Sequence, residues 1–228
     1  TQGVSSAASD VYKRQTLGWS TGLPGGDENR SLKTVWFYNI TEWPTFISGS
    51  IGGWPLGWLD VPVPSITYFM CLLVFAGLIL SGLNDLSKRK ALALSLIFAA
   101  LLILPLRILA LGKNFVGENV QPRYFLPLIF LFVGISLIST NKSEEFWLSR
   151  TQIFVIILAS SIANFFALHF VLRRFITGTD VVDWNLNRNI EWWWSFMPSP
   201  LISWFIGSIS FSIAVTIGLW QMRDNLKY

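Results

Sequence analysis

Residues 91–111 read ALALSLIFAALLILPLRILAL, and this stretch decides the fold class. It matches the length of about 20 mostly apolar residues that a spanning α-helix needs. Similar runs lie at residues 65–83, 124–140, 152–171 and 201–220. Because the runs are continuously apolar instead of alternating, they indicate helices and not barrel strands. The sequence therefore predicts an all-α, polytopic transmembrane helix bundle with about five spanning helices.

The composition supports a membrane protein. Hydrophobic residues make up 52% of the chain, charged residues 13%, and the mean hydropathy is +0.51. Many of the 12 Trp and 18 Phe flank the apolar runs, as aromatic belts do at a membrane surface. Basic residues are scattered between the runs, which argues against nucleic-acid binding and favours contact with membrane lipid.

No metal or cofactor is expected from the sequence. Cys71 is the one cysteine and lies in an apolar run, so the chain cannot form an internal disulfide or a cysteine-based metal site. His169 is also alone, and packing near a helix end is the more common role for such a residue.

The first residues differ in character from the rest. Residues 5–15 read SSAASDVYKRQ, which is the translation of a transposon-type sequencing adapter. We therefore expect residues 1–15 to be an artefact and the native frame to begin near Thr16, with the true N-terminus missing. Residues 16–64 then form an outer, partly interfacial segment, and residues 65–228 form the bundle.

The orientation follows from the distribution of basic residues. Lys88, Arg89 and Lys90 form the densest basic cluster and lie between the first two runs, which places that loop in the cytoplasm. Alternation then places residues 16–64, 113–123 and 172–200 outside. Residues 34–48 are aromatic but too polar to span, and we interpret them as an interfacial helix or a re-entrant segment broken at Pro44.

Two outer motifs carry arginines against the usual insertion preference. ENVQPRYFLP at residues 118–127 contains Gln121 and Arg123, and LRRFITG at residues 172–178 contains Arg173 and Arg174. An outer arginine can bind a lipid phosphate with its planar donor fork, or it can anchor a helix at the interface. Adjacent residues point about 100° apart on a helix, so only one of Arg173 and Arg174 can face a shared cavity.

Other outer motifs have simpler structural readings. GWLDVPVP at residues 57–64 holds Asp60 in a turn before the first run, and EWWW at residues 191–194 favours an interfacial belt over a platform for a sugar ring. The triplet at Asn39 fits the glycosylation acceptor pattern, which also arises by chance.

Together, GWLDVPVP at 57–64, VQPRYFLPL at 120–128 and LRRFITG at 172–178 resemble the bacterial membrane proteins grouped as domain of unknown function 2142. Two positions depart from the expected pattern: Pro122 stands where Gly is usual, and Phe175 stands where Tyr is frequent. Neither change removes an arginine. The resemblance implies a multi-pass protein of the inner (plasma) membrane.

That family looks like a distant branch of the GT-C glycosyltransferases, which transfer sugars from polyprenyl-phosphate carriers at the outer face. The resemblance implies a role in cell-envelope glycan assembly, with Arg123 and Arg174 contacting the lipid phosphate. Gln121, Asp60 and Arg173 would be further substrate contacts. The catalytic acid would lie upstream of this chain, which would then be inactive alone. A transporter or flippase for a lipid-linked glycan and a non-catalytic scaffold remain the alternatives.

Overall fold

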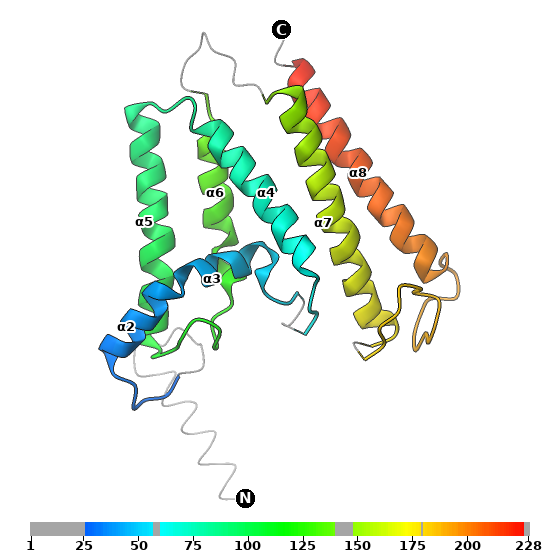
Figure 1. Ribbon diagram of the computed structural model, residues 1–228, viewed down its shortest axis with the longest axis horizontal. Coiled ribbons are helices and arrows are strands. Elements are labelled where there is room, and N and C mark those ends of the chain that lie inside the picture. Colours follow the sequence, from blue (N-terminus) through cyan, green and yellow to red (C-terminus); the bar gives the residue numbers. More distant parts are fainter. Residues whose placement is uncertain (1–25, 57–59, 140–147, 179, 226–228) are drawn as a thin grey trace, which may run out of the picture.

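The computed structural model describes residues 26–56, 60–139, 148–178 and 180–225. Four of its helices are long and apolar enough to cross a membrane: α4 (Ser65–Gly82), α5 (Lys88–Leu111), α7 (Arg150–Ile176) and α8 (Pro200–Asn225). They run side by side in Figure 1. The predicted all-α membrane bundle is therefore confirmed.

The run expected to span at residues 124–140 forms a shorter helix. The 3₁₀ turn η2 (Pro122–Phe125) leads into α6 (Leu126–Leu137), which has 12 residues. At about 1.5 Å per α-helical residue and about 2.0 Å per 3₁₀ residue, the two together reach about 26 Å. The bilayer core is about 30 Å thick. Within the described residues, four helices are therefore long enough to cross the membrane, and the fifth apolar helix is shorter.

The four long helices and the shorter α6 form a row in the order α5, α6, α4, α7 and α8. In this row α6 packs on α5 and α4, while α7 packs on α4 and α8 (Figure 1). Large apolar side chains remain exposed along the row, including Leu96, Phe154 and Ile209. In a membrane these side chains face lipid, which accounts for the high hydrophobic content of the chain.

The segment before the first long helix lies across one end of the row. α2 (Leu32–Thr41), α3 (Trp43–Ser48) and the π-helical turn η1 (Gly49–Gly53) cross in front of α5 and α6 in Figure 1. The predicted break occurs at Glu42, two residues before Pro44, because Pro44 lies in the first turn of α3, where a missing N–H costs little.

A proline in α5 explains how α3 docks. Pro105 has no N–H, so the carbonyl of Leu101 cannot receive its usual helical hydrogen bond. The indole N–H of Trp43 donates to this carbonyl at 3.0 Å. Leu101 lies ten residues from the end of α5, about 15 Å along the helix. This depth favours the re-entrant interpretation of residues 34–48 over a purely interfacial helix.

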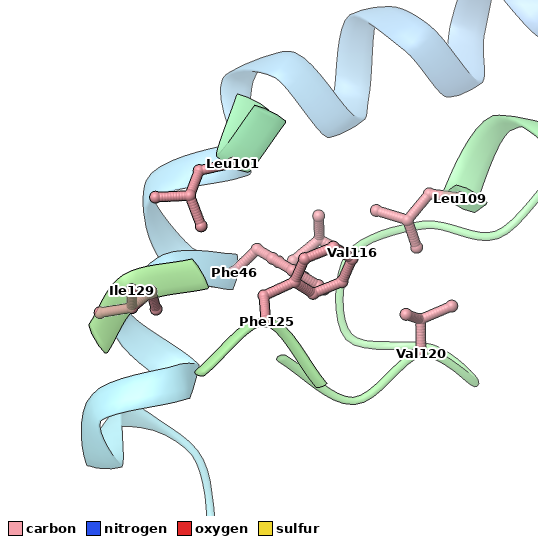
Figure 2. Close-up of a cluster of buried hydrophobic side chains, with 7 residues drawn as sticks. All are labelled: Phe46, Leu101, Leu109, Val116, Val120, Phe125 and Ile129. Atoms are coloured by element: carbon pink, nitrogen blue, oxygen red, sulfur yellow. The ribbon is translucent and has the colours of Figure 1, made fainter. Parts of the chain in front are cut away.

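Phe46 also holds α3 against α5 and the start of α6, through apolar contacts. It is fully buried among Leu101, Leu109, Val116, Val120, Phe125 and Ile129. Figure 2 shows its ring at the centre of this cluster, with Phe125 5.5 Å away between ring centroids. Burying a Phe side chain stabilises a fold by about 1.5–3 kcal/mol. Trp43 and Phe46 therefore hold α3 against α5 and the start of α6.

The opposite end of the row is held by a buried lysine. The ammonium group of Lys90 donates to the carbonyls of Gly82 at 2.7 Å, Asp85 at 2.8 Å and Ile138 at 2.9 Å. Gly82 ends α4 and Ile138 caps α6, so one cation satisfies the C-terminal carbonyls of two helices. Lys90 is thus a structural residue as well as part of the basic cluster.

Candidate functional site

The candidate residues predicted from the sequence gather at one end of the bundle. Asp60 precedes α4, Gln121 and Arg123 lie at η2, and Arg173 and Arg174 lie in the last turn of α7. This end is the lower one in Figure 1. The Lys88–Lys90 cluster lies at the opposite end, so the predicted orientation would put all five candidates outside.

Arg174 forms an ion pair with Asp60. Its Nε donates to a carboxylate oxygen of Asp60 at 2.7 Å, and both side chains are more than one-third exposed. Reciprocal backbone hydrogen bonds between Leu56 and Val61 support the position of Asp60. An exposed pair of this kind contributes only about 0–1 kcal/mol, so it can open at little cost.

Arg173 has the opposite environment, because it is only 6% exposed. Its Nη1 donates to the hydroxyl of Thr177 at 3.3 Å, whereas its Nε and Nη2 have no hydrogen-bond partner. The two adjacent arginines have different surroundings, since Arg173 is buried and the side chain of Arg174 is 40% exposed. The prediction that only one of them faces a shared cavity stays a prediction. A buried guanidinium with two free donors is uncommon and requires an explanation.

The segment from residue 180 to 199 covers Arg173. Backbone N–H groups of Glu191 and Trp192 donate to the last carbonyl of α7, that of Ile176, at 2.8 and 3.3 Å. Leu186, within this segment, is fully buried. Gly178, after the end of α7, has a φ of +81°, a left-handed conformation that glycine adopts without strain.

Asp183 is the carboxylate of this segment that interacts electrostatically with Arg173. Its oxygens accept hydrogen bonds from the backbone of Asn185 at 2.9 Å and from Arg188 at 3.4 Å. These hydrogen bonds, that of Asn185 first, together with the charges of Arg188 and Arg173, hold the pKa of Asp183 below its usual range. Asp183 is therefore ionised at neutral pH, and it accepts its hydrogen bonds from Asn185 and Arg188 and not from Arg173.

His169 continues the polar face of α7 one turn below Arg173. It is 3% exposed, its Nε2 lies 3.0 Å from the carbonyl oxygen of Trp184, and its Nδ1 has no partner. The rings of Trp184 and Trp204 pack on it. The packing role predicted for His169 is confirmed, but its place beside Arg173 was missed; the four-residue spacing was the available signal.

Gln121 and Arg123 lie at the start of η2, and a hydrogen bond from η1 stabilises this turn. The hydroxyl of Ser50 in η1 donates to the carbonyl of the buried Pro122 at 2.8 Å. Arg123 is exposed, and the side-chain oxygen of Gln121 is buried without a partner. η1 packs on both η2, which contains Arg123, and α4, which follows Asp60. A pocket shared by Arg123 and Arg174 stays a prediction.

A second ion pair holds the loop that leads to Gln121. Arg30 binds both carboxylate oxygens of Glu118, at 2.6 and 2.8 Å, and its guanidinium lies 4.0 Å above the ring of Phe115. The hydrogen bond from Arg30 lowers the pKa of Glu118, helped by the backbone N–H of Phe115. Sequence reasoning missed this pair, because nothing local connects residues 88 positions apart.

Asn39 ties the same loop to α2. Its side-chain amide donates to the carbonyl of Asn114 at 2.9 Å and accepts from the N–H of Val116 at 2.9 Å. Asn39 is 1% exposed, so the triplet at this position is not an accessible glycosylation acceptor. Within the described residues no group of three or more His, Cys, Asp or Glu could hold a metal ion.

Residues 29–132 match the model of a family described as a predicted membrane protein (DUF2142). The resemblance noted from the sequence motifs is thereby confirmed. The matched stretch begins before α2 and ends in α6, so it contains Asp60, Gln121 and Arg123 and stops before Arg173. No curated protein and no solved structure matches the chain.

Proposed function

We propose that this multi-pass membrane protein binds a phosphate-bearing lipid at the outer end of α7, in the assembly of bacterial cell-envelope glycans. Its fullest form is a glycosyltransferase that uses a polyprenyl-phosphate sugar at the outer face of the inner membrane. The observation that carries the proposal is the buried guanidinium of Arg173, in which two donor nitrogens, Nε and Nη2, have no hydrogen-bond partner.

An anion explains these free donors better than a neutral ligand does. A buried charge is stable only when it is paired and hydrogen-bonded, and phosphate supplies both negative charge and several acceptor oxygens. The guanidinium fork matches two phosphate oxygens at once. The position at the end of a spanning helix corresponds to the depth at which a lipid carries its phosphate.

Arg174 and Asp60 would form the exposed edge of this site. Their ion pair is weak enough to exchange, so Arg174 can turn to a phosphate while the Asp60 carboxylate becomes free to accept from a sugar hydroxyl. Arg123 and Gln121 would contact the same lipid from the η2 side. Such contacts stabilise negative charge on a leaving phosphate, which is what sugar transfer requires.

The test is binding of undecaprenyl phosphate to the chain in lipid nanodiscs, with undecaprenol as the uncharged comparison. Replacing Arg173 by Lys keeps the charge but removes the fork, and we expect binding to weaken about tenfold or more. Arg188→Lys is the matched control, since Arg188 lies in the covering segment and is mostly exposed. Its affinity should stay at the wild-type value.

Further variants measure how much each arginine contributes to binding of the lipid phosphate. Arg174→Lys and Arg123→Lys should each weaken binding less than Arg173→Lys, because Arg123 is exposed and the side chain of Arg174 is 40% exposed. Equal binding of the phosphate and of the alcohol would contradict the proposal, as would wild-type affinity in Arg173→Lys. If the protein bound the lipid phosphate but transferred no sugar to any envelope glycan, it would be a lipid-phosphate carrier or a scaffold and not a glycosyltransferase.

A further inference from the structure

Arg173 is closed to any ligand while the covering segment, residues 180–199, is in place. Its Nε and Nη2 have no hydrogen-bond partner, and neither atom is accessible to solvent. The residue as a whole is only 6% exposed. A phosphate can therefore bind these two donors only after a part of the protein has moved.

The covering segment lies over the face of α7 that carries Arg173. His169 and Phe166 lie on the same face, at spacings of four and seven residues from Arg173. The ring of Trp184 packs on both, with centroids 4.9 and 5.8 Å away. Asp183, next to Trp184, interacts electrostatically with Arg173. Since α7 itself packs on α4 and α8, the covering segment is the part that can move.

The covering segment is held down by a small number of contacts. All of its residues are described, and among them there is no helix or strand and Leu186 is the one buried residue. Two of its backbone N–H groups share a single acceptor, the carbonyl of Ile176. The carbonyl oxygen of Trp184 lies 3.0 Å from Nε2 of His169. A segment with so little buried apolar surface can open locally while the rest of the protein stays folded.

The charge of Asp183 does not lock the segment onto α7. Asp183 accepts its hydrogen bonds from Asn185 and Arg188, which belong to the same segment. It therefore stabilises the shape of the segment and attracts Arg173 without a direct hydrogen bond. A phosphate carries charge of the same sign and offers acceptor oxygens as well, so it can take the place of Asp183 when the segment moves away.

The outward side of the covering segment is apolar. Val182 is 97% exposed and Phe196 77%, and Trp184, Trp192 and Trp194 are each at least 44% exposed. The segment joins the ends of two spanning helices, α7 and α8, and so lies at a membrane surface, where tryptophan side chains are favoured. These side chains can keep their contact with lipid when the segment moves toward the bilayer, so this direction of opening does not transfer them to water.

We propose that the covering segment is a lid that opens toward the bilayer and lets a lipid phosphate reach Arg173. The lid is part of the proposed lipid-phosphate site and rests on that function. A phosphate bound to Nε and Nη2 occupies space that the seated segment fills, so the bound phosphate and the closed lid exclude each other. The closed lid therefore lowers the apparent affinity for the lipid, in proportion to the fraction of molecules that are open.

The variant Leu186→Ala distinguishes a lid from a segment that supports the binding site. Truncation of a fully buried leucine shifts the equilibrium toward the open lid by more than about tenfold. Affinity of the chain in lipid nanodiscs for undecaprenyl phosphate should therefore rise about tenfold, up to the limit set by the open fraction. Val182→Ala is the matched control, because Val182 lies in the same segment and is exposed, and it should bind like the wild type. Unchanged or weaker binding in Leu186→Ala would overturn the lid.

Modification of single cysteines measures the opening directly. With Cys71 replaced by Ala, a water-soluble maleimide should modify Val182→Cys at once and Leu186→Cys slowly, and undecaprenyl phosphate but not undecaprenol should accelerate Leu186→Cys. Val120→Cys, at a buried position in another loop at the same end, should stay unmodified with either lipid. If the lipid phosphate binds and Leu186→Cys reacts no faster than Val120→Cys, the lid alone is wrong. If undecaprenyl phosphate does not bind at all, the proposed function fails and the lid fails with it.

Discussion

Replacing Lys90 by Met should destabilise the bundle, although the side chains are similar in length. In the native chain the ammonium binds three carbonyls and joins the ends of α4 and α6. Methionine fills the same space but donates no hydrogen bond. Lys88→Met is the matched control, because Lys88 belongs to the same basic cluster and is exposed.

The magnitude follows from the environments of the three carbonyls. The hydrogen bond to Gly82 is buried, so its carbonyl would be left unpaired at a cost of about 1–3 kcal/mol. The hydrogen bonds to Asp85 and Ile138 are only partly buried, and water can replace the lysine there at about 0–1 kcal/mol each. The expected loss of unfolding free energy is about 1–5 kcal/mol. A surface change such as Lys88→Met should stay within about 0.5 kcal/mol.

The assay is reversible unfolding in mixed detergent and SDS micelles, followed by the fluorescence of the tryptophans. Both variants lose one positive charge from the same loop, so an effect on insertion would appear in both. Equal stability of Lys90→Met and Lys88→Met would refute the reasoning, because it would show that the ammonium does not hold the two helix ends.

Three further predictions use similar measurements. Gly82→Ala should cost about 1–3 kcal/mol, because its methyl would lie 2.2 Å from a carbonyl oxygen of α6, whereas Gly77→Ala has free space and should not destabilise. Glu118 has a lowered pKa, so its ion pair stabilises the fold fully above the ordinary value of 4.5 and loses this effect as the pH falls through the lower folded-state value. Glu118→Gln should remove that part of the acid dependence in unfolding titrations from pH 6 to 3. In a cysteine-free background, an impermeant maleimide applied to intact cells should label Val182→Cys and spare Leu86→Cys; the reverse pattern would invert the predicted orientation.

The fold class was predictable because lipid imposes a simple rule on sequence. Backbone groups in hydrocarbon must be satisfied within a helix, so each apolar run of sufficient length indicates a span. The limits of α6 were harder to predict, because Leu137 is followed by apolar and small residues that do not mark a helix end. α6 ends where the ammonium group of Lys90 donates a hydrogen bond to the carbonyl of Ile138, and this contact could not be predicted from the sequence.

The candidate arginines could be selected from the sequence by residue type, but their environments could not be predicted. They were selected because the predicted orientation places them outside, where the insertion preference disfavours them. The sequence could not show that Arg173 is buried and Arg174 exposed, since that depends on how residues 180–199 fold over α7. The Arg30–Glu118 pair and the Trp43–Leu101 hydrogen bond were also unpredictable, because each joins segments distant in sequence.

Through these long-range contacts, residues 26–56 and 60–64 reach both groups of candidate residues at the same end of the bundle. On one side, Arg30 holds Glu118 and Ser50 holds Pro122, which together fix the backbone that carries Arg123. On the other side, Asp60 pairs with Arg174. The segment is also attached to α5, where the indole of Trp43 donates to the Leu101 carbonyl that Pro105 leaves without a helical donor. Contacts from the residues before α4 therefore reach both arginine-bearing regions, which are separated by 51 positions in sequence.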